Sequence, residues 1–115
     1  MTGMPRERLT IVVAGAGLIG RRHVELIGES NECALGGIVD PAPAATEWAR
    51  AMNVPTFASV ADCLAQRRPD GVILATPNAL HVPQALECIA AGVPVLVEKP
   101  VAHTVADGER LAAAV

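Results

Sequence analysis

The stretch that decides the fold is residues 9–20, LTIVVAGAGLIG. Its first half, residues 9–14, is an aliphatic and β-branched run with no polar residue after Thr10. Such a run predicts a strand that is covered on both faces, as in a parallel sheet. The second half is a G-x-G-x-x-G turn, and the apolar spacing of residues 18–29 predicts a helix directly after it. A strand, a glycine turn and a helix in succession are typical of a doubly wound α/β domain.

Each glycine of the turn has a separate physical task. Gly15 permits the tight turn, Gly17 lacks a Cβ so that the backbone can approach a pyrophosphate, and Gly20 lets the helix pack closely on the strand. The N–H groups and the dipole at the helix N-terminus would then hold the phosphates. Glycines also occur in unrelated turns, so a doubly wound domain that binds no dinucleotide stays open as the alternative.

Asp40 adds to the dinucleotide hypothesis because it ends the second predicted strand, the expected ~20 residues after Gly20. A carboxylate there accepts hydrogen bonds from the adenosine ribose hydroxyls and repels a 2′-phosphate. The next residue is Pro41, not an Arg or Lys that would welcome that phosphate. NAD is therefore favoured over NADP, although Arg21 and Arg22 in the first helix turn would soften the preference.

Apolar runs alternate with helix-length segments along the rest of the chain. The expected strands are residues 9–14, 34–39, 55–57, 71–75 and 93–97. The expected helices are residues 18–29, 44–52, 60–66 and 82–91, with a last helix after Thr104. Ser59 and Thr104 are predicted N-caps, and Gly92 is a predicted C-terminal stop. This alternation predicts a right-handed, doubly wound parallel sheet with strand order 3-2-1-4-5.

Length and composition limit the other possibilities. The chain has 115 residues, which suits one compact domain and is too short for a (β/α)₈ barrel of about 250 residues. Net charge is −3, charges of both signs are interspersed, and Trp48 and Phe57 are the only aromatic residues. Nucleic acid is therefore not an expected partner.

Cysteine usage and hydropathy predict the compartment. Cys33, Cys63 and Cys88 are widely spaced without a C-x-x-C pair, so we expect three small buried hydrophobes and neither disulfides nor a metal site. The N-terminal MTGMPRERLT is polar, and no segment approaches the roughly 20 apolar residues of a membrane span. We therefore expect a cytoplasmic protein with no membrane partner.

Two further segments carry polar residues at the predicted carboxyl edge of the sheet, where open α/β folds bind ligands. Residues 75–78 (ATPN) follow the fourth strand and precede His81, and residues 98–100 (EKP) follow the fifth. A lysine beside a bound nicotinamide is a candidate electrostatic or acid–base group. Taken alone, Lys99 is also typical of a solvated turn, and His81 of a helix-start histidine that bonds nearby backbone.

Four stretches together resemble the N-terminal domain of the Gfo/Idh/MocA oxidoreductase family, named for glucose–fructose oxidoreductase and inositol dehydrogenase. They are residues 12–25 (VVAGAGLIGRRHVE), 38–41 (IVDP), 75–81 (ATPNALH) and 95–104 (VLVEKPVAHT). The resemblance covers nearly the whole chain. It implies a Rossmann domain that binds NAD or, less readily, NADP.

The resemblance also implies roles for the candidate site residues. Those that would contact the cofactor are Gly15, Gly17, Leu18, Ile19, Gly20, Asp40, Thr76, Pro77, Asn78, His81 and Glu98. Asp40 would hold the adenosine ribose, and Glu98 would lie near the nicotinamide ribose. Lys99 would be the catalytic residue, meeting the substrate hydroxyl or carbonyl as hydride moves to or from the ring.

Members of that family carry a C-terminal α/β domain that binds substrate, usually forms the dimer and supplies a catalytic histidine. Nothing in this chain matches that domain, so we expect residues 1–115 to be an N-terminal piece that lacks turnover alone and forms a homo-oligomer only with the missing domain. The expected function is the nucleotide-binding domain of an NAD(P)-dependent oxidoreductase acting on a small sugar, polyol or similar hydroxy or keto compound.

Two other functions remain open at this point. One is a non-catalytic nucleotide-sensing module that uses the same glycine turn. The other is a methyltransferase-like domain that binds S-adenosylmethionine; the Glu98-Lys99-Pro100 segment argues against it, because methyl transfer does not call for that lysine.

Overall fold

The computed structural model describes residues 7–115, so the polar residues 1–6 that entered the targeting argument lie outside it. The strands are β1 (Leu9–Ala14), β2 (Cys33–Val39), β3 (Thr56–Phe57), β4 (Gly71–Leu74) and β5 (Val95–Val97). The helices are α1 (Leu18–Glu29), α2 (Pro43–Ala51), α3 (Val60–Gln66), α4 (His81–Ala90) and α5 (Val105–Ala114). A 3₁₀ turn, η1 (Asn78–Leu80), precedes α4 and was not predicted.

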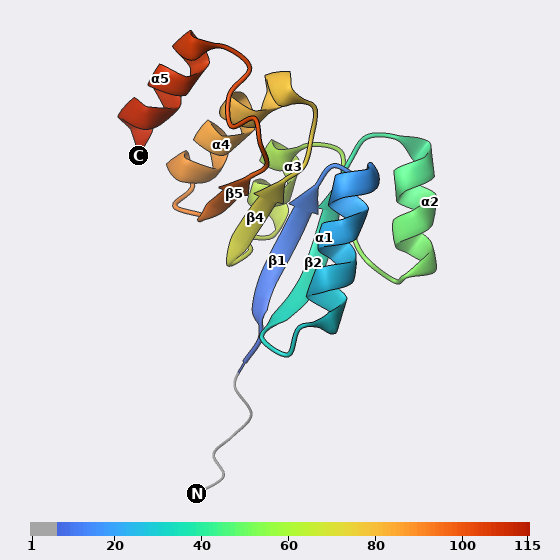
Figure 1. Cartoon of the computed structure of the whole chain (residues 1–115). Coiled ribbons are helices and arrows are strands. Elements are labelled where there is room, and N and C mark those ends of the chain that lie inside the picture. Colours follow the sequence, from blue (N-terminus) through green and yellow to red (C-terminus); the bar gives the residue numbers. More distant parts are fainter. Residues whose placement is uncertain (1–6) are drawn as a thin grey trace, which may run out of the picture.

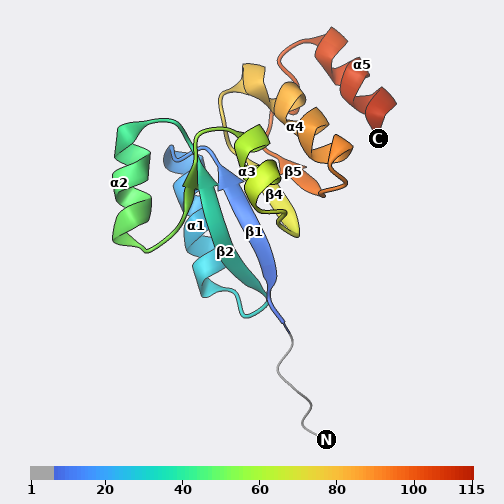
Figure 2. The same ribbon diagram turned by 180° about the vertical axis from the view of Figure 1, so that it is seen from behind.

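The strands form one parallel sheet in the order β3-β2-β1-β4-β5, which confirms the predicted strand order (Figure 1). Helices α1 and α2 cover one face, and α3 and α4 cover the other (Figure 2). The central strand β1 is buried from both sides. Val12 and Ala14 pack with α3 and α4, whereas Val13 packs with α1 and α2. This two-sided burial explains why the sequence of β1 shows no polar alternation.

The predicted helix caps are present. Ser59 Oγ accepts the N–H of Asp62 at 3.1 Å, and Thr104 Oγ1 accepts the N–H of Asp107 at 3.1 Å. Helix α4 stops where expected because Gly92 adopts a φ of +71°, which is costly for other residues. These caps fix where the helices begin and end, and therefore where the loops at the sheet edges lie.

The fifth strand is shorter than predicted, at Val95–Val97 instead of residues 93–97. The N–H of Val93 is taken by the carbonyl of Cys88 at 2.9 Å, which completes the cap of α4. Pro94 has no N–H to give to a ladder, although its carbonyl accepts the N–H of Val72. Residues 93 and 94 therefore serve the helix end and the turn into the strand.

The cysteine prediction is right for two residues and wrong for the third. Cys63 and Cys88 are buried between the sheet and the α3–α4 layer, and burial raises the pKa of the Cys88 thiol to about 11. Cys33 is only partly buried because it begins β2 at the amino edge of the sheet. All three are free thiols.

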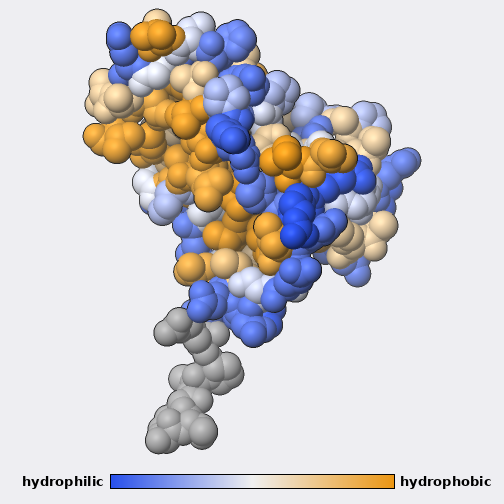
Figure 3. Space-filling model, viewed as in Figure 1, coloured by the Kyte–Doolittle hydropathy of each residue, from blue (hydrophilic) through white to orange (hydrophobic). Residues whose placement is uncertain are grey.

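The α1 face of the sheet is open over β4 and β5. Ile73 is partly exposed there and Leu96 is 52% exposed, and apolar side chains gather over this part of the surface (Figure 3). Within residues 7–115, no helix has both the length and the hydropathy needed to cross a membrane.

Candidate functional site

The glycine turn joins β1 to α1, and two of its glycines are required by the fold itself. Gly15 has a φ of +98°, and a Cβ there would lie 2.4 Å from the carbonyl oxygen of Ala75. A Cβ on Gly20 would lie 1.8 Å from the carbonyl oxygen of Gly15. Both contacts are with backbone, which cannot move aside as a flexible side chain would. The predicted tasks of a tight turn and of close helix packing are therefore seen directly.

Gly17 differs from these two glycines. It is the N-cap of α1, its φ of −78° is open to any residue, and a Cβ built there meets nothing within 4 Å. The fold therefore does not need a glycine at this position. Gly17 instead leaves an open cradle before the helix N-terminus, where the first N–H groups have no partner within the helix. This is the space and polarity that a pyrophosphate needs.

Asp40 closes the same turn from the end of β2. Its Oδ2 accepts the N–H of Ala16 at 3.0 Å, and its Oδ1 accepts the N–H of Ala42 at 2.9 Å. An ionised carboxylate has about four acceptor positions, so two remain for ligand hydroxyls. The carboxylate lines a cavity of about 360 Å³ together with Gly15 and Pro77. The cavity fits the predicted ribose site.

The two arginines of the first helix turn have partners of their own. The Arg21 guanidinium lies 4.4 Å from the centroid of the Trp48 ring, and its Nε donates to the carbonyl of Ala16 at 3.0 Å. Arg22 pairs with Glu25 on the same helix at 2.9 Å. Both cations are therefore engaged by partners along α1 and α2.

A second hollow, of about 220 Å³, lies where β4 and β5 end beside the start of α1. Its lining brings together residues that are far apart in the sequence, namely Ile19, Ala75, Thr76, Asn78, His81, Glu98 and Lys99. The Thr76 hydroxyl donates to Gln84 Oε1 at 2.6 Å, which fixes the loop after β4 on α4. Of the predicted cofactor and catalytic residues in the second half of the chain, all but Pro77 therefore line this hollow, and Pro77 lines the first cavity.

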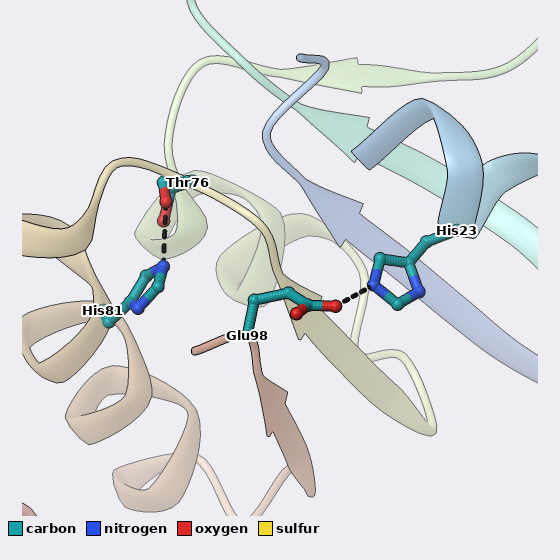
Figure 4. A network of polar contacts seen from close by, with 4 residues as sticks. All are labelled: His23, Thr76, His81 and Glu98. Atoms are coloured by element: carbon teal, nitrogen blue, oxygen red, sulfur yellow. Dashed lines mark hydrogen bonds and ion pairs between the residues drawn. The ribbon is translucent and has the colours of Figure 1, made fainter. Parts of the chain in front are cut away.

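Glu98 makes a contact that the sequence argument missed. Nε2 of His23 on α1 lies 2.5 Å from Oε2 of Glu98 and donates to this carboxylate (Figure 4). That hydrogen bond, with the neighbouring backbone N–H of Lys99 as a smaller cause, lowers the pKa of Glu98. The signal for His23 was its spacing: it follows Gly20 by three residues, so both lie on the same face of α1.

His81 begins α4 and is 1% exposed. Its Nε2 lies 2.8 Å from the carbonyl oxygen of Thr76 (Figure 4). Its Nδ1 lies 2.7 Å from the carbonyl oxygen of Pro100. The expectation of a helix-start histidine that bonds backbone is confirmed. The ring also lines the hollow that contains Lys99. In the part of the chain that the structure describes, no group of three or more His, Cys, Asp or Glu residues could hold a metal ion.

A parallel sheet in this strand order, a glycine turn leading into α1 and an acid at the end of β2 define a dinucleotide-binding α/β domain. Residues 9–115 match the family described as an oxidoreductase family with an NAD-binding Rossmann fold, and the chain belongs to this family. This confirms the resemblance stated from the sequence, and it confirms NAD as the cofactor of the fold.

The relatives that this chain matches are longer than the chain itself. The rhizopine catabolism protein MocA of Rhizobium meliloti is 32% identical over 109 residues, covering 95% of this chain and 34% of MocA. Inositol 2-dehydrogenase of Corynebacterium glutamicum is 34% identical over 98 residues, covering 82% of this chain and 29% of that enzyme. The chain spans about a third of the length of these relatives.

A solved relative shows the same fold. The structure of the WlbA dehydrogenase from Bordetella pertussis, in complex with NADH and UDP-GlcNAcA, superposes with a TM-score of 0.88 at 35% identity. The match covers 94% of this chain and 34% of that one. The architecture described above therefore matches about a third of that longer chain.

Proposed function

We propose that residues 1–115 are the NAD-binding domain of a dehydrogenase that acts on a hydroxyl or carbonyl group of a sugar, a polyol or a related small molecule. The single observation that carries the proposal is the open cradle at Gly17, next to a carboxylate that keeps free acceptor positions. Support for the substrate class comes from relatives named for inositol and from one crystallised with a nucleotide sugar.

Residues of this chain bind the cofactor at two places. The N–H groups at the start of α1 bind the pyrophosphate over Gly17, and Asp40 accepts hydrogen bonds from the adenosine ribose. Thr76, Pro77 and Asn78 border the path from there to the second hollow, where Glu98 accepts from the nicotinamide ribose. NAD, when bound, takes or gives a hydride at its nicotinamide ring.

Lys99 is the proposed catalytic residue. It is exposed and lines the second hollow, with the carboxylate of Glu98 as its neighbour in the chain. An ammonium group there donates a proton to a substrate carbonyl oxygen, or its neutral form accepts one from a hydroxyl, as hydride moves. A further domain of the longer protein would bind the rest of the substrate and form the homo-oligomer, and we place that protein in the cytoplasm.

The test combines binding with turnover. Calorimetry on this chain should show saturable NADH binding that Lys99→Met leaves within about threefold, because the lysine lies beyond the phosphate and ribose contacts. In the complete protein, the same substitution should reduce turnover of the substrate by about 10²-fold or more, the usual scale of general acid–base catalysis.

Two results would count against the proposal. Absence of NADH binding to the wild-type chain would refute the cofactor assignment. Full turnover in the Lys99→Met protein would remove Lys99 from the chemistry and favour another catalytic group.

A further inference from the structure

The two chain neighbours of Lys99 are each held by a histidine from a different helix. On one side, the side chain of Glu98 accepts from His23 of α1 at 2.5 Å. On the other side, the carbonyl of Pro100 lies 2.7 Å from Nδ1 of His81, which begins α4. Lys99 therefore lies between two long-range contacts. His23 is 75 residues from Glu98 in the sequence, and His81 is 19 residues from Pro100.

The His81 contact joins two strand ends through one ring. Thr76 follows β4 and Pro100 follows β5, and these strands are neighbours in the sheet. The ring of His81 lies between the two carbonyls, at 2.8 Å and 2.7 Å. The loop that borders the cofactor path and the loop that carries Lys99 are thereby tied to each other, in addition to the hydrogen bonds of the sheet.

The bridge is well shielded from water. Both partners of the ring are carbonyl oxygens, which only accept hydrogen bonds, so a ring N–H is the donor in this bridge. His81 is 1% exposed, so water has little access to replace a lost partner. Loss of the ring would leave the two loops joined through the sheet but not through this side chain.

Two charged residues, Glu98 and Lys99, line the same hollow as this ring. The groups that contact the ring itself are the carbonyls of Thr76 and Pro100.

We propose that His23 and His81 are positioning residues for Lys99, with His81 acting as a bridge between the loops after β4 and β5. The proposal rests on the proposed role of Lys99. By holding the side chain of Glu98 and the backbone carbonyl of Pro100, the two histidines limit the motion of the lysine that lies between these residues. The effect of such positioning on a rate is large, because a misplacement of about 1 Å can cost about 10²-fold.

A first experiment measures order at Lys99 without using activity. NMR relaxation and amide hydrogen exchange are recorded for the wild-type chain, for His81→Phe and His23→Leu, and for His103→Gln as a control. His103 is exposed and lies in the same segment after Pro100. We expect the Lys99 amide to lose order in the first two variants and to keep it in the control.

The ring itself gives a second readout in the wild-type chain. We expect the NMR signals of the His81 ring to show hydrogen bonding to a carbonyl oxygen and slow exchange with water. Unchanged order at Lys99 in both His23→Leu and His81→Phe would overturn the proposal, and a His81 ring that shows no hydrogen bond would overturn the bridge. If His81→Phe does not fold, His23→Leu decides alone, because His23 lies partly at the surface.

A third experiment uses the complete protein and separates kcat from binding. Both variants should lower kcat by about 10- to 100-fold, a larger factor than the change in the Kd for NADH. His23→Gln, which keeps a side-chain N–H for Glu98, should restore most of the rate. Wild-type kcat in both variants would overturn the positioning role. If the wild-type protein binds no NADH, the proposed function fails, whereas the order measurement still decides whether the histidines hold Lys99.

Discussion

The carboxylate of Asp40 and the backbone N–H of Ala16 are joined by a hydrogen bond of 3.0 Å that spans 24 residues of sequence. The residue that lines the first cavity is therefore also a structural part of the glycine turn. Under the proposed function, cofactor preference and the geometry of the phosphate cradle depend on the same side chain.

Replacing Asp40 by Ala should weaken NADH binding by about 10- to 100-fold, since hydrogen bonds to a charged group are worth about 1.5–3 kcal/mol. The ratio of NADPH to NADH affinity should rise, because the charge that repels a 2′-phosphate is gone. Calorimetric titration with both cofactors measures this. Equal NADH affinity in the variant would show that Asp40 does not contact the cofactor.

Substitutions at two of the turn glycines should have different effects, one on NADH binding and one on stability. Gly17→Val should abolish NADH binding while thermal unfolding stays near wild type, because the new side chain occupies only the open cradle. Gly20→Ala should destabilise the protein by about 1–3 kcal/mol or more, since its Cβ would displace the backbone of Gly15.

Gly28 supplies the matched control for both substitutions. It is exposed on α1, and a Cβ there meets nothing within 4 Å. Gly28→Ala should therefore stabilise the helix by about 0.5–1 kcal/mol and leave NADH binding unchanged. A Gly17→Val protein that binds NADH normally would contradict the cradle assignment.

Thiol reactivity should distinguish the three cysteines. Cys33 is partly exposed and should react with a disulfide reagent in the native protein. Burial raises the pKa of Cys63 and brings that of Cys88 to about 11, so both thiols should stay unreactive until the protein unfolds. Counting released thiolate with and without denaturant checks this, and three rapidly reacting thiols in the native state would contradict the observed burial.

The contact between His23 and Glu98 predicts a loss of stability in acid. The hydrogen bond lowers the pKa of Glu98 below its ordinary 4.5, so the folded state favours the ionised carboxylate. Its contribution is complete above about pH 4.5 and disappears as the pH falls through the lowered value. Urea unfolding at several pH values, compared with His23→Leu, should show the difference between the proteins shrinking in acid. A constant difference would mean that the contact does not depend on the charge of Glu98.

Much of the fold followed from local sequence. The two-sided burial of β1, the caps at Ser59 and Thr104 and the stop at Gly92 depend on a few adjacent residues, and each is found as predicted. The short β5 was missed because the N–H of Val93 serves a helix cap, which the apolar run does not reveal.

The residues of the candidate site were predicted from the sequence, but the hydrogen bonds that join its distant segments were not. The link between His23 and Glu98 and the bridge from His81 to Pro100 join segments that only the folded sheet brings together. No periodicity or spacing within one element encodes such partners. The exposure of Cys33 was missed for a similar reason, since it depends on which end of β2 lies at the sheet's edge.

All of the proposed site lies at the carboxyl edge of the sheet, and the opposite edge carries none of it. An exposed turn on that far side, such as the one around Asn31 between α1 and β2, is therefore a suitable place for a fluorescent label or a surface tether. A sensor built in this way would report on coenzyme without its dye competing for the same space.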